Sequence, residues 1–198
     1  MRKIFLDCGT HYGEGLEQIS KIHNMDESWE IYTWEANPHS HRIFKSKHNS
    51  DLNITSYLSA VNTFDGTISL NIETLPNTDY RTSITGEATT IMDLQLIHKT
   101  NSYGNTFSSN MNVSCIDFSK WILNNCTLQD LVIIKFDIEG SEYSILEKMI
   151  EDDTIKLVDE MYIEWHPNIF VDNTTYIDKQ NNIERILKEH NIKLNQWH

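Results

Sequence analysis

Short apolar runs alternate along most of the chain with stretches whose apolar residues recur every three or four positions. The short runs predict strands at 3–7, 30–35, 54–61, 67–72, 112–116, 131–136, 158–165 and 192–197. The periodic stretches predict helices at 13–23, 38–48, 117–124, 141–150 and 177–190. Strands that are apolar throughout are typical of sheets buried on both faces. The pattern therefore predicts an α/β fold, a doubly wound, mostly parallel sheet with helices on both faces.

Two stretches depart from this alternation. Asp65-Gly66 lies between the predicted strands 54–61 and 67–72, which indicates a hairpin. Residues 73–110 are rich in Thr, Ser and Asn, and their one apolar cluster, at 91–97, is a short helix or a strand. A loop this long inside a compact domain is usually functional or mobile. We interpret 73–110 as a substrate-side insertion in a single domain that spans 1–198.

The composition restricts the partners and the compartment. The net charge of −13 repels phosphate backbones and anionic lipids, so we expect neither nucleic acid nor a membrane as a partner. Three cysteines without metal-ligand spacing indicate reduced thiols and a cytoplasmic location. The chain leads directly into a strand, and no apolar run approaches 18 residues, so we expect neither a secretion signal nor a membrane span.

The junction of the first predicted strand and helix, residues 7–13 (Asp-Cys-Gly-Thr-His-Tyr-Gly), is a glycine turn of the kind that binds nucleotides. Glu35 ends the next strand, 22 residues past Gly13, where an acidic side chain can bind ribose hydroxyls. A dinucleotide fingerprint needs a further glycine after Gly9, but the bulky residues 10–12 occupy that space. S-adenosylmethionine has a ribose and an adenine but no phosphate, and its carboxylate suits a helix N-terminus.

Acidic residues gather where the predicted strands end. Ligands of parallel α/β sheets bind beyond the carboxyl ends of the strands. Any one of these side chains could instead cap a helix or solvate a loop, but five carboxylates and a histidine on one rim favour a site. The residues are Asp7, Glu35, Asp137, Glu139, Glu164 and His166.

Three segments together resemble the FkbM-type methyltransferases, a branch of the class I fold that uses S-adenosylmethionine. They are residues 5–13, 34–38 (Trp-Glu-Ala-Asn-Pro) and 134–142 (Ile-Lys-Phe-Asp-Ile-Glu-Gly-Ser-Glu). The last is the most specific, because a strand ending in Lys-x-Asp-x-Glu-Gly-x-Glu before a helix is close to a family signature. The resemblance covers about residues 3–166 and implies a Rossmann-like class I fold that is shortened at both ends. Its sheet would have six main strands, unless a partner such as a second copy completes it.

The resemblance also implies roles for individual residues. From its methionine end to its adenine, S-adenosylmethionine would contact Asp7, Gly9, Thr10 and Gly13, then Glu35, then Ala36, Asn37 and Ala60. Asp137 and Glu139 would face the transferred methyl group.

Methyl transfer to a hydroxyl requires alignment of the acceptor and a base for its proton. Asp137 and His166 are the candidate bases, although His166 could simply end its strand with its imidazole bonded to a backbone carbonyl. Lys135 points to the same side of its strand as Asp137 and either binds substrate or pairs with a carboxylate. A less favoured alternative places a divalent ion of the Mg²⁺ or Mn²⁺ kind among Asp137, Glu139, Glu164 and His166.

The function that these patterns favour is methyl transfer from S-adenosylmethionine to a hydroxyl of a small molecule or a carbohydrate. Two alternatives stay open at this point. One is a nucleotide-binding or dinucleotide-binding enzyme on a Rossmann-type sheet, and the other is a catalytically silent cofactor-binding subunit.

Overall fold

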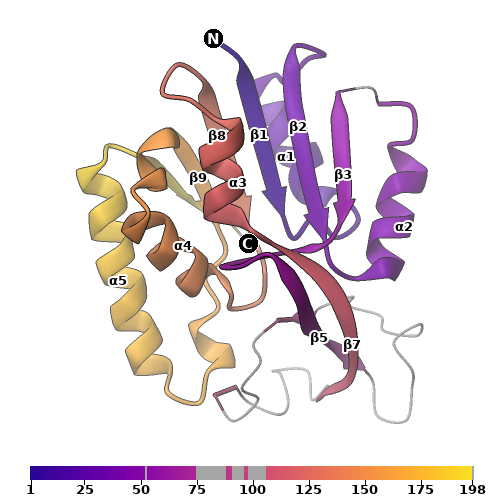
Figure 1. Cartoon of the computed structure of the whole chain (residues 1–198), viewed down its shortest axis with the longest axis vertical. Coiled ribbons are helices and arrows are strands. Elements are labelled where there is room, and N and C mark those ends of the chain that lie inside the picture. The colour runs from indigo at the N-terminus through magenta and orange to yellow at the C-terminus, as the bar shows by residue number, and fades with distance from the viewer. Residues whose placement is uncertain (52, 75–87, 91–95, 98–105, 198) are drawn as a thin grey trace.

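The structure, a computed structural model, describes residues 1–51, 53–74, 88–90, 96–97 and 106–197. A six-stranded sheet in the order β10-β9-β8-β1-β2-β3 dominates it, and every neighbouring pair is parallel (Figure 1). The predicted doubly wound parallel sheet is therefore confirmed. Its strands in chain order are β1 (Lys3–Cys8), β2 (Trp29–Glu35), β3 (Ile54–Leu58), β8 (Leu131–Phe136), β9 (Glu160–Ile163) and β10 (Lys193–Gln196).

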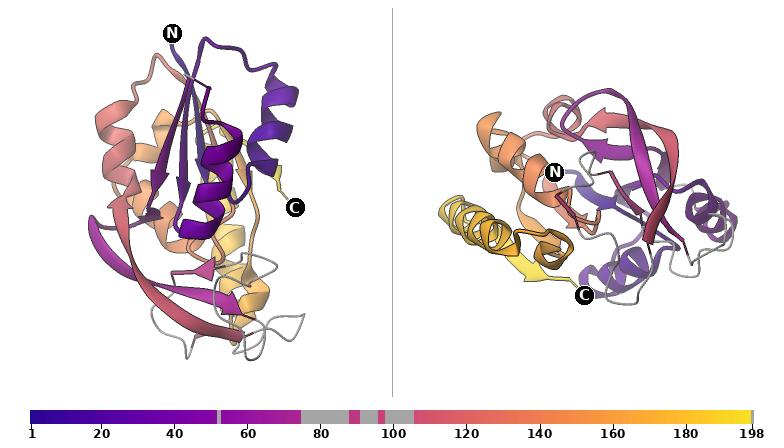
Figure 2. Two further views of the ribbon diagram at one scale, coloured as in Figure 1. Left: turned by 90° about the vertical axis from the view of Figure 1, so that its right-hand side faces the viewer. Right: turned by 90° about the horizontal axis from the view of Figure 1, so that it is seen from below.

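Helices cover both faces of this sheet (Figure 2). On one face, Leu16 of α1 and Phe44 of α2 pack in a core with Phe5. On the other face, Leu6 packs in a second core with residues of α3, α4 and α5. Because successive side chains of a strand point to opposite faces, two cores require the continuous apolar runs seen in the sequence. The helices are α1 (Glu14–His23), α2 (Pro38–Lys47), α3 (Phe118–Asn125), α4 (Glu142–Glu151) and α5 (Asn173–Glu189).

A second sheet lies beyond the carboxyl ends of the main strands, where β5 and β7 extend past β1 and β2 (Figure 1). Its order is β4-β7-β5-β6, with β4 parallel to β7 and with β5 antiparallel to both β7 and β6. The edge of the main sheet where ligands are expected thus faces a second layer. The strands are β4 (Ala60–Asn62), β5 (Gly66–Thr74), β6 (Ala88–Thr89) and β7 (Thr106–Asp117).

The predicted hairpin of 54–61 with 67–72 is wrong. Ser59 divides the first of these segments into β3 and β4, which belong to different sheets. The strand β7 lies between β4 and β5. Asp65, which the sequence places in a tight turn, accepts a hydrogen bond from the amide of Asp117 at the end of β7 (3.0 Å). The strand that follows Asp65, β5, therefore pairs with β7 on the side opposite β4 and does not pair with β3.

The interpretation of 73–110 as a segment without regular structure is wrong in part. It contains the end of β5, all of β6 and the beginning of β7, which starts at Thr106 and not at 112. The cluster at 91–97 lies mostly outside the described residues, although Ile97 forms an isolated bridge with Phe170. Strands rich in Thr, Ser and Asn lack the apolar signal by which strands are recognised.

Side-chain caps decide where the helices begin. Asp117 accepts the amide of the third residue of α3 (3.0 Å), which confirms the predicted cap, and α2 begins at Pro38 as predicted. The helix predicted at 177–190 begins earlier, because Asp172 caps α5 in the same way (3.3 Å). Among the described residues, no helix is long and apolar enough to cross a membrane.

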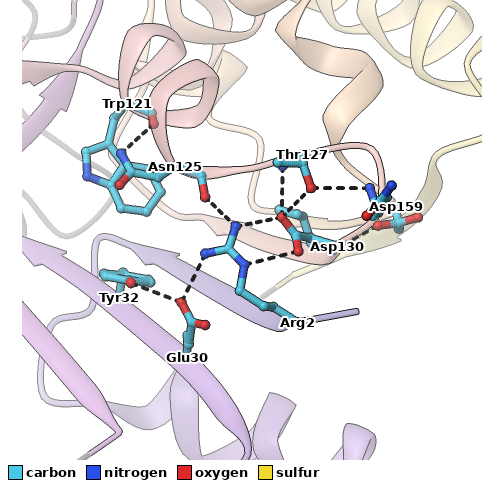
Figure 3. A network of polar contacts seen from close by, with 10 residues as sticks. Arg2, Glu30, Tyr32, Trp121, Asn125, Thr127, Asp130 and Asp159 are labelled. Carbon is cyan, nitrogen blue, oxygen red and sulfur yellow. Dashed lines mark hydrogen bonds and ion pairs between the residues drawn. The ribbon is translucent and has the colours of Figure 1, made fainter.

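Figure 3 shows a polar network at the end of the main sheet where β1 and β8 begin. The guanidinium of Arg2 donates to both oxygens of Asp130, at 3.1 and 2.7 Å, and to the carbonyl of Asn125 at 2.8 Å. The same carboxylate accepts the amide and the hydroxyl of Thr127, both at 2.9 Å. The network therefore ties the chain before β1 to the loop that leads into β8.

We predict that Asp130→Asn lowers the free energy of unfolding by about 1 kcal/mol at pH 7, because it weakens hydrogen bonds to a charged group near the surface. The Arg2 guanidinium lowers the pKa of Asp130 below its ordinary 3.8. The contribution of the carboxylate is thus present above pH 4 and is lost as the pH falls below that value. Urea unfolding at pH 7 and pH 3 measures both effects; a difference between wild type and variant that grows at pH 3 would contradict the assignment.

Candidate functional site

A cavity of about 280 Å³ opens at the carboxyl ends of β1, β2 and β8 and extends to the second sheet. Its size is near the lower end of the roughly 300–1,000 Å³ typical of small-molecule sites. The described residues that line it are Gly9, His11, Trp34, Glu35, Ala36, Ser59, Ala60, Val61, Leu70, Thr90, Asp137, Ile138, Glu139 and Glu164.

The turn after β1 reaches the cavity through Gly9. The Gly9 amide donates to the carbonyl of Trp34 (3.0 Å), and its φ of 79° is a conformation that favours glycine. A Cβ at this position would lie 1.8 Å from the carbonyl oxygen of Asp137. The turn therefore touches β2 on one side and the loop after β8 on the other, and only a glycine fits between them.

Glu35 is held with its carboxylate at the cavity. One oxygen accepts the amide of His11 and the other accepts the amide of Asn37, each at 2.7 Å. These bonds fix the orientation of the carboxylate and leave each oxygen a further lone pair. Burial raises the pKa of Glu35 to about 7, although the two amides and the Lys135 charge oppose this rise. Its charge therefore changes near neutral pH.

Three other predicted cofactor residues support the wall of the cavity and do not line it. Thr10 donates its hydroxyl to the carbonyl of Asp7 (3.0 Å), and Gly13 precedes the first residue of α1 with a φ of 99°. Asn37 caps α2 by accepting the amide of His39 (3.0 Å). These contacts hold the two loops from which Gly9 and Glu35 project.

Lys135 is buried behind the cavity and connects its two sides. Its ammonium lies 3.4 Å from a carboxylate oxygen of Asp7 and 3.2 Å from one of Asp137, and it donates to the carbonyl of Gly9 (2.9 Å). Asp7 and Lys135 are also register partners across β1 and β8. The side chain runs over Gly15 of α1, where a Cβ would come within 2.6 Å of the Lys135 Cε.

This environment keeps Lys135 charged. Burial alone would lower the pKa of the ammonium, but the carboxylates of Asp137 and Asp7 raise it above its ordinary value. Burial raises the pKa of Asp7 in spite of the lysine. Of the two roles considered for Lys135, the geometry favours pairing with carboxylates over contact with substrate.

The opposite wall of the cavity is acidic. Asp137 and Glu139 follow β8, and Glu164 follows β9, so the three side chains come from neighbouring parallel strands. Glu139 has a φ of 53°, in the left-handed region where non-glycine residues are uncommon. Burial, and then the Asp137 charge, raise the pKa of Glu164.

His166 lies against this acidic wall. Its Nδ1 is 3.0 Å from an oxygen of Glu142, and its Nε2 is 3.6 Å from Glu139 and 3.8 Å from Glu164. Burial would lower the pKa of His166, but Glu142 and Glu139 raise it to about 10. Both ring nitrogens of His166 lie against carboxylates, so of the two candidate bases the geometry favours Asp137.

The structure thus divides the residues singled out in the sequence. Seven lie on the cavity wall: Gly9, Glu35, Ala36, Ala60, Asp137, Glu139 and Glu164. The others lie behind the wall, where they contact either the lining residues or one another: Asp7, Thr10, Gly13, Asn37, Lys135 and His166. Their roles toward cofactor and substrate stay predictions, which are taken up below.

Sequence reasoning missed the contribution of the second sheet and the partner of His166. Leu70 of β5 and Thr90 after β6 line the cavity, but the sequence signal for these strands is weak. Glu142 is completely buried and accepts the amide of Ile138 (2.8 Å) as well as contacting His166. The sequence signal that could have indicated this partner is the position of Glu142, which begins α4 three residues past Glu139.

The family model described as the methyltransferase FkbM domain matches residues 7–194 of this chain. A solved structure, the methyltransferase FkbM from Methylobacillus flagellatus KT, has a similar fold, with a TM-score of 0.51 and 15% sequence identity. The similarity covers 93% of this chain but 37% of that one, so this chain spans a little more than a third of its length. No curated protein matches this chain.

We predict that Lys135→Met lowers the free energy of unfolding by about 3–5 kcal/mol, because it leaves the buried carboxylate of Asp7 without its partner. The double variant Asp7→Asn/Lys135→Met should lose less stability than the two single variants together. Denaturant unfolding of all four proteins measures the coupling.

Lys156→Met is the matched control for this prediction. Lys156 is half exposed and pairs with Asp153 at the surface, so its loss should change stability by no more than about 0.5 kcal/mol. An equal loss of stability in Lys135→Met and Lys156→Met would mean that the buried ion pair does not have the structural importance assigned to it.

Proposed function

The chain belongs to the FkbM methyltransferase family, and on this basis we propose that it transfers the methyl group of S-adenosylmethionine to a hydroxyl oxygen of a small molecule or a carbohydrate. Both the use of this cofactor and the choice of oxygen are part of the proposal.

The observation that carries the proposal is the pair of hydrogen bonds, donated by the backbone amides of His11 and Asn37, that orients the Glu35 carboxylate. A carboxylate held in this way can accept both hydroxyls of a ribose without reorganisation, which lowers the entropic cost of binding. Ala36 and Ala60, which line the cavity nearby, have side chains small enough for the flat adenine to lie against them. The cofactor would then extend from this end of the cavity toward Gly9 and the acidic wall.

The transferred methyl group would lie near Asp137. In the reaction, the acceptor oxygen forms a bond to the methyl carbon while the bond from that carbon to the sulfonium sulfur breaks. The acceptor proton passes to the Asp137 carboxylate, and the products are a methyl ether and S-adenosylhomocysteine. Lys135 contacts Asp137 on the buried side (3.2 Å) and would keep its carboxylate in place.

The acceptor would enter from the side of β5 and β6, because the main sheet and Ala60 of β4 would provide the cofactor end of the cavity. Leu70 and Thr90 give this side an apolar group and a hydroxyl group. Such a wall suits a hydroxylated ligand with some apolar surface. The net charge of −13 disfavours a polyanion such as nucleic acid as the acceptor.

A dinucleotide enzyme is the main competing function. The bulky His11 lines the cavity where a pyrophosphate would need close approach to the backbone, and this disfavours it. Titrations with NAD test this alternative directly.

We predict that S-adenosylmethionine binds at pH 8 and that Glu35→Gln weakens binding by about tenfold or more, through the loss of hydrogen bonds to a charged group. Because hydroxyls donate to the ionised carboxylate, binding requires Glu35 to lose its proton. Its pKa of about 7 therefore predicts that wild-type affinity falls about tenfold between pH 8 and pH 6. Calorimetric titration at both pH values measures these changes, and Glu35→Gln should lack this part of the pH dependence.

Asp130→Asn is the control for these titrations, since Asp130 lies at the other end of the sheet, and it should bind like wild type. Absence of binding of both S-adenosylmethionine and S-adenosylhomocysteine to folded protein, or tighter binding of NAD, would refute the proposed cofactor.

We predict that Asp137→Asn lowers the rate of methyl transfer by about 10²–10⁴-fold, because the amide cannot accept the acceptor proton. The affinity for S-adenosylmethionine should change by only a few-fold. The measurement is transfer of a radiolabelled methyl group to a panel of sugars and hydroxylated small molecules, with Asp130→Asn as the active control. Unchanged turnover in Asp137→Asn would exclude Asp137 as the base.

A further inference from the structure

We propose that Asp137, Glu139 and His166 form a binding site for one divalent cation of the Mg²⁺ or Mn²⁺ class. The site lies on the acidic wall of the cavity, where β8 and β9 end side by side. Ion binding by these residues is independent of the proposed methyl transfer, whereas the use of the ion in catalysis rests on it.

The ligand atoms are close enough to share an ion. One oxygen of Asp137, one oxygen of Glu139 and one ring nitrogen of His166 all lie within 4.8 Å of one another. Ligands about 2.1 Å from an octahedral ion are about 3 Å apart when adjacent and about 4.2 Å apart when opposite. Rearrangement of these half-buried side chains would bring the three atoms to such distances.

The contact between Glu142 and His166 provides a second, independent argument. Glu142 comes from α4, is completely buried, and places an oxygen 3.0 Å from the Nδ1 of His166. The amide of Ile138 donates to the same oxygen (2.8 Å) and fixes it. Metal-bound histidines characteristically donate their other ring nitrogen to a carboxylate in this way. The arrangement directs Nε2 toward the carboxylates of Glu139 and Glu164.

The charges around the site favour a cation. Four carboxylates surround it, those of Asp137, Glu139, Glu142 and Glu164. The Lys135 ammonium contacts Asp137, but it contacts Asp7 as well, so it does not neutralise the carboxylates of the site. A divalent ion would reduce the mutual repulsion of carboxylates that are partly removed from water.

The chemistry of the ligands indicates the class of ion. Two carboxylates and one imidazole are harder than the thiolate-rich sets that select zinc or copper, and the described part of the chain shows all three cysteines, Cys8, Cys115 and Cys126, as buried free thiols. Three protein ligands leave positions for water or for an acceptor hydroxyl. An acceptor oxygen on the ion would be held beside the methyl group and would lose its proton more readily.

The test uses the whole chain of residues 1–198, treated with EDTA and then freed of it, and titrated with MnCl₂ in the absence of cofactor. Electron paramagnetic resonance of free Mn²⁺ should show one bound ion per chain. Glu139→Gln, at a partly exposed position, should weaken binding at least tenfold, and His166→Ala should do the same. Pulsed measurements on the bound ion should show coupling to an imidazole nitrogen in wild type and not in His166→Ala.

Glu142→Gln tests the positioning role, and we expect it to weaken Mn²⁺ binding about 10–100-fold. Asp130→Asn is the acidic-to-amide control outside the site and should bind Mn²⁺ like wild type. Circular dichroism of each variant establishes that it is folded.

Three results would overturn the proposal: no Mn²⁺ bound at millimolar concentration, binding that Glu139→Gln and His166→Ala leave unchanged, or bound Mn²⁺ without nitrogen coupling in wild type. In the last two cases the ion would be bound non-specifically by acidic side chains at the surface, and His166 would act only as a cationic partner of the glutamates. The titrations of S-adenosylmethionine test the proposed function separately, so the two proposals can fail independently.

Discussion

The buried ammonium of Lys135 is the interaction on which the rest of the site depends. It lies between two carboxylates of like charge, the buried Asp7 and the half-buried Asp137, and it donates a hydrogen bond to the carbonyl of Gly9. A charge in this position is costly to bury and is retained only with good partners. The lysine therefore fixes the turn after β1 relative to the loop after β8. The open side of Asp137 is left for chemistry, while its buried side is structural.

Much of this arrangement could be predicted from the sequence. Fully apolar runs such as 131–136 give a strong signal for strands buried on both faces, and the order of strands and helices then restricts the topology. The polar residues that end these runs, Glu35 and Asp137 among them, could be placed on one rim because parallel strands end on the same side of a sheet. Local features that depend on a few neighbouring residues, such as the Asp117 cap of α3, could also be predicted from the sequence.

The remainder depends on contacts that a single sequence does not contain. The strands β5 and β7 are far apart in the sequence and pair with each other only in the folded chain. Their Thr, Ser and Asn residues do not form a strong apolar pattern that would predict them. The break at Ser59 has no local signal, because both halves of 54–61 favour a strand and only pairing with different sheets separates them. The burial of Lys135 follows from the absence of a Cβ at Gly15, on another element. Likewise, the contact of His166 with Glu142 arises only once α4 packs beside the end of β9.

The contact of Gly9 with the carbonyl of Asp137 has a consequence for how substrates can be distinguished. Because the space between them is too small for a methyl group, the turn after β1 and the loop after β8 are packed directly against each other. If the proposed function holds, the backbone of these two segments sets the distance between cofactor and base. Acceptors of different size would then be accommodated by changes in β5 and β6, on the other side of the cavity.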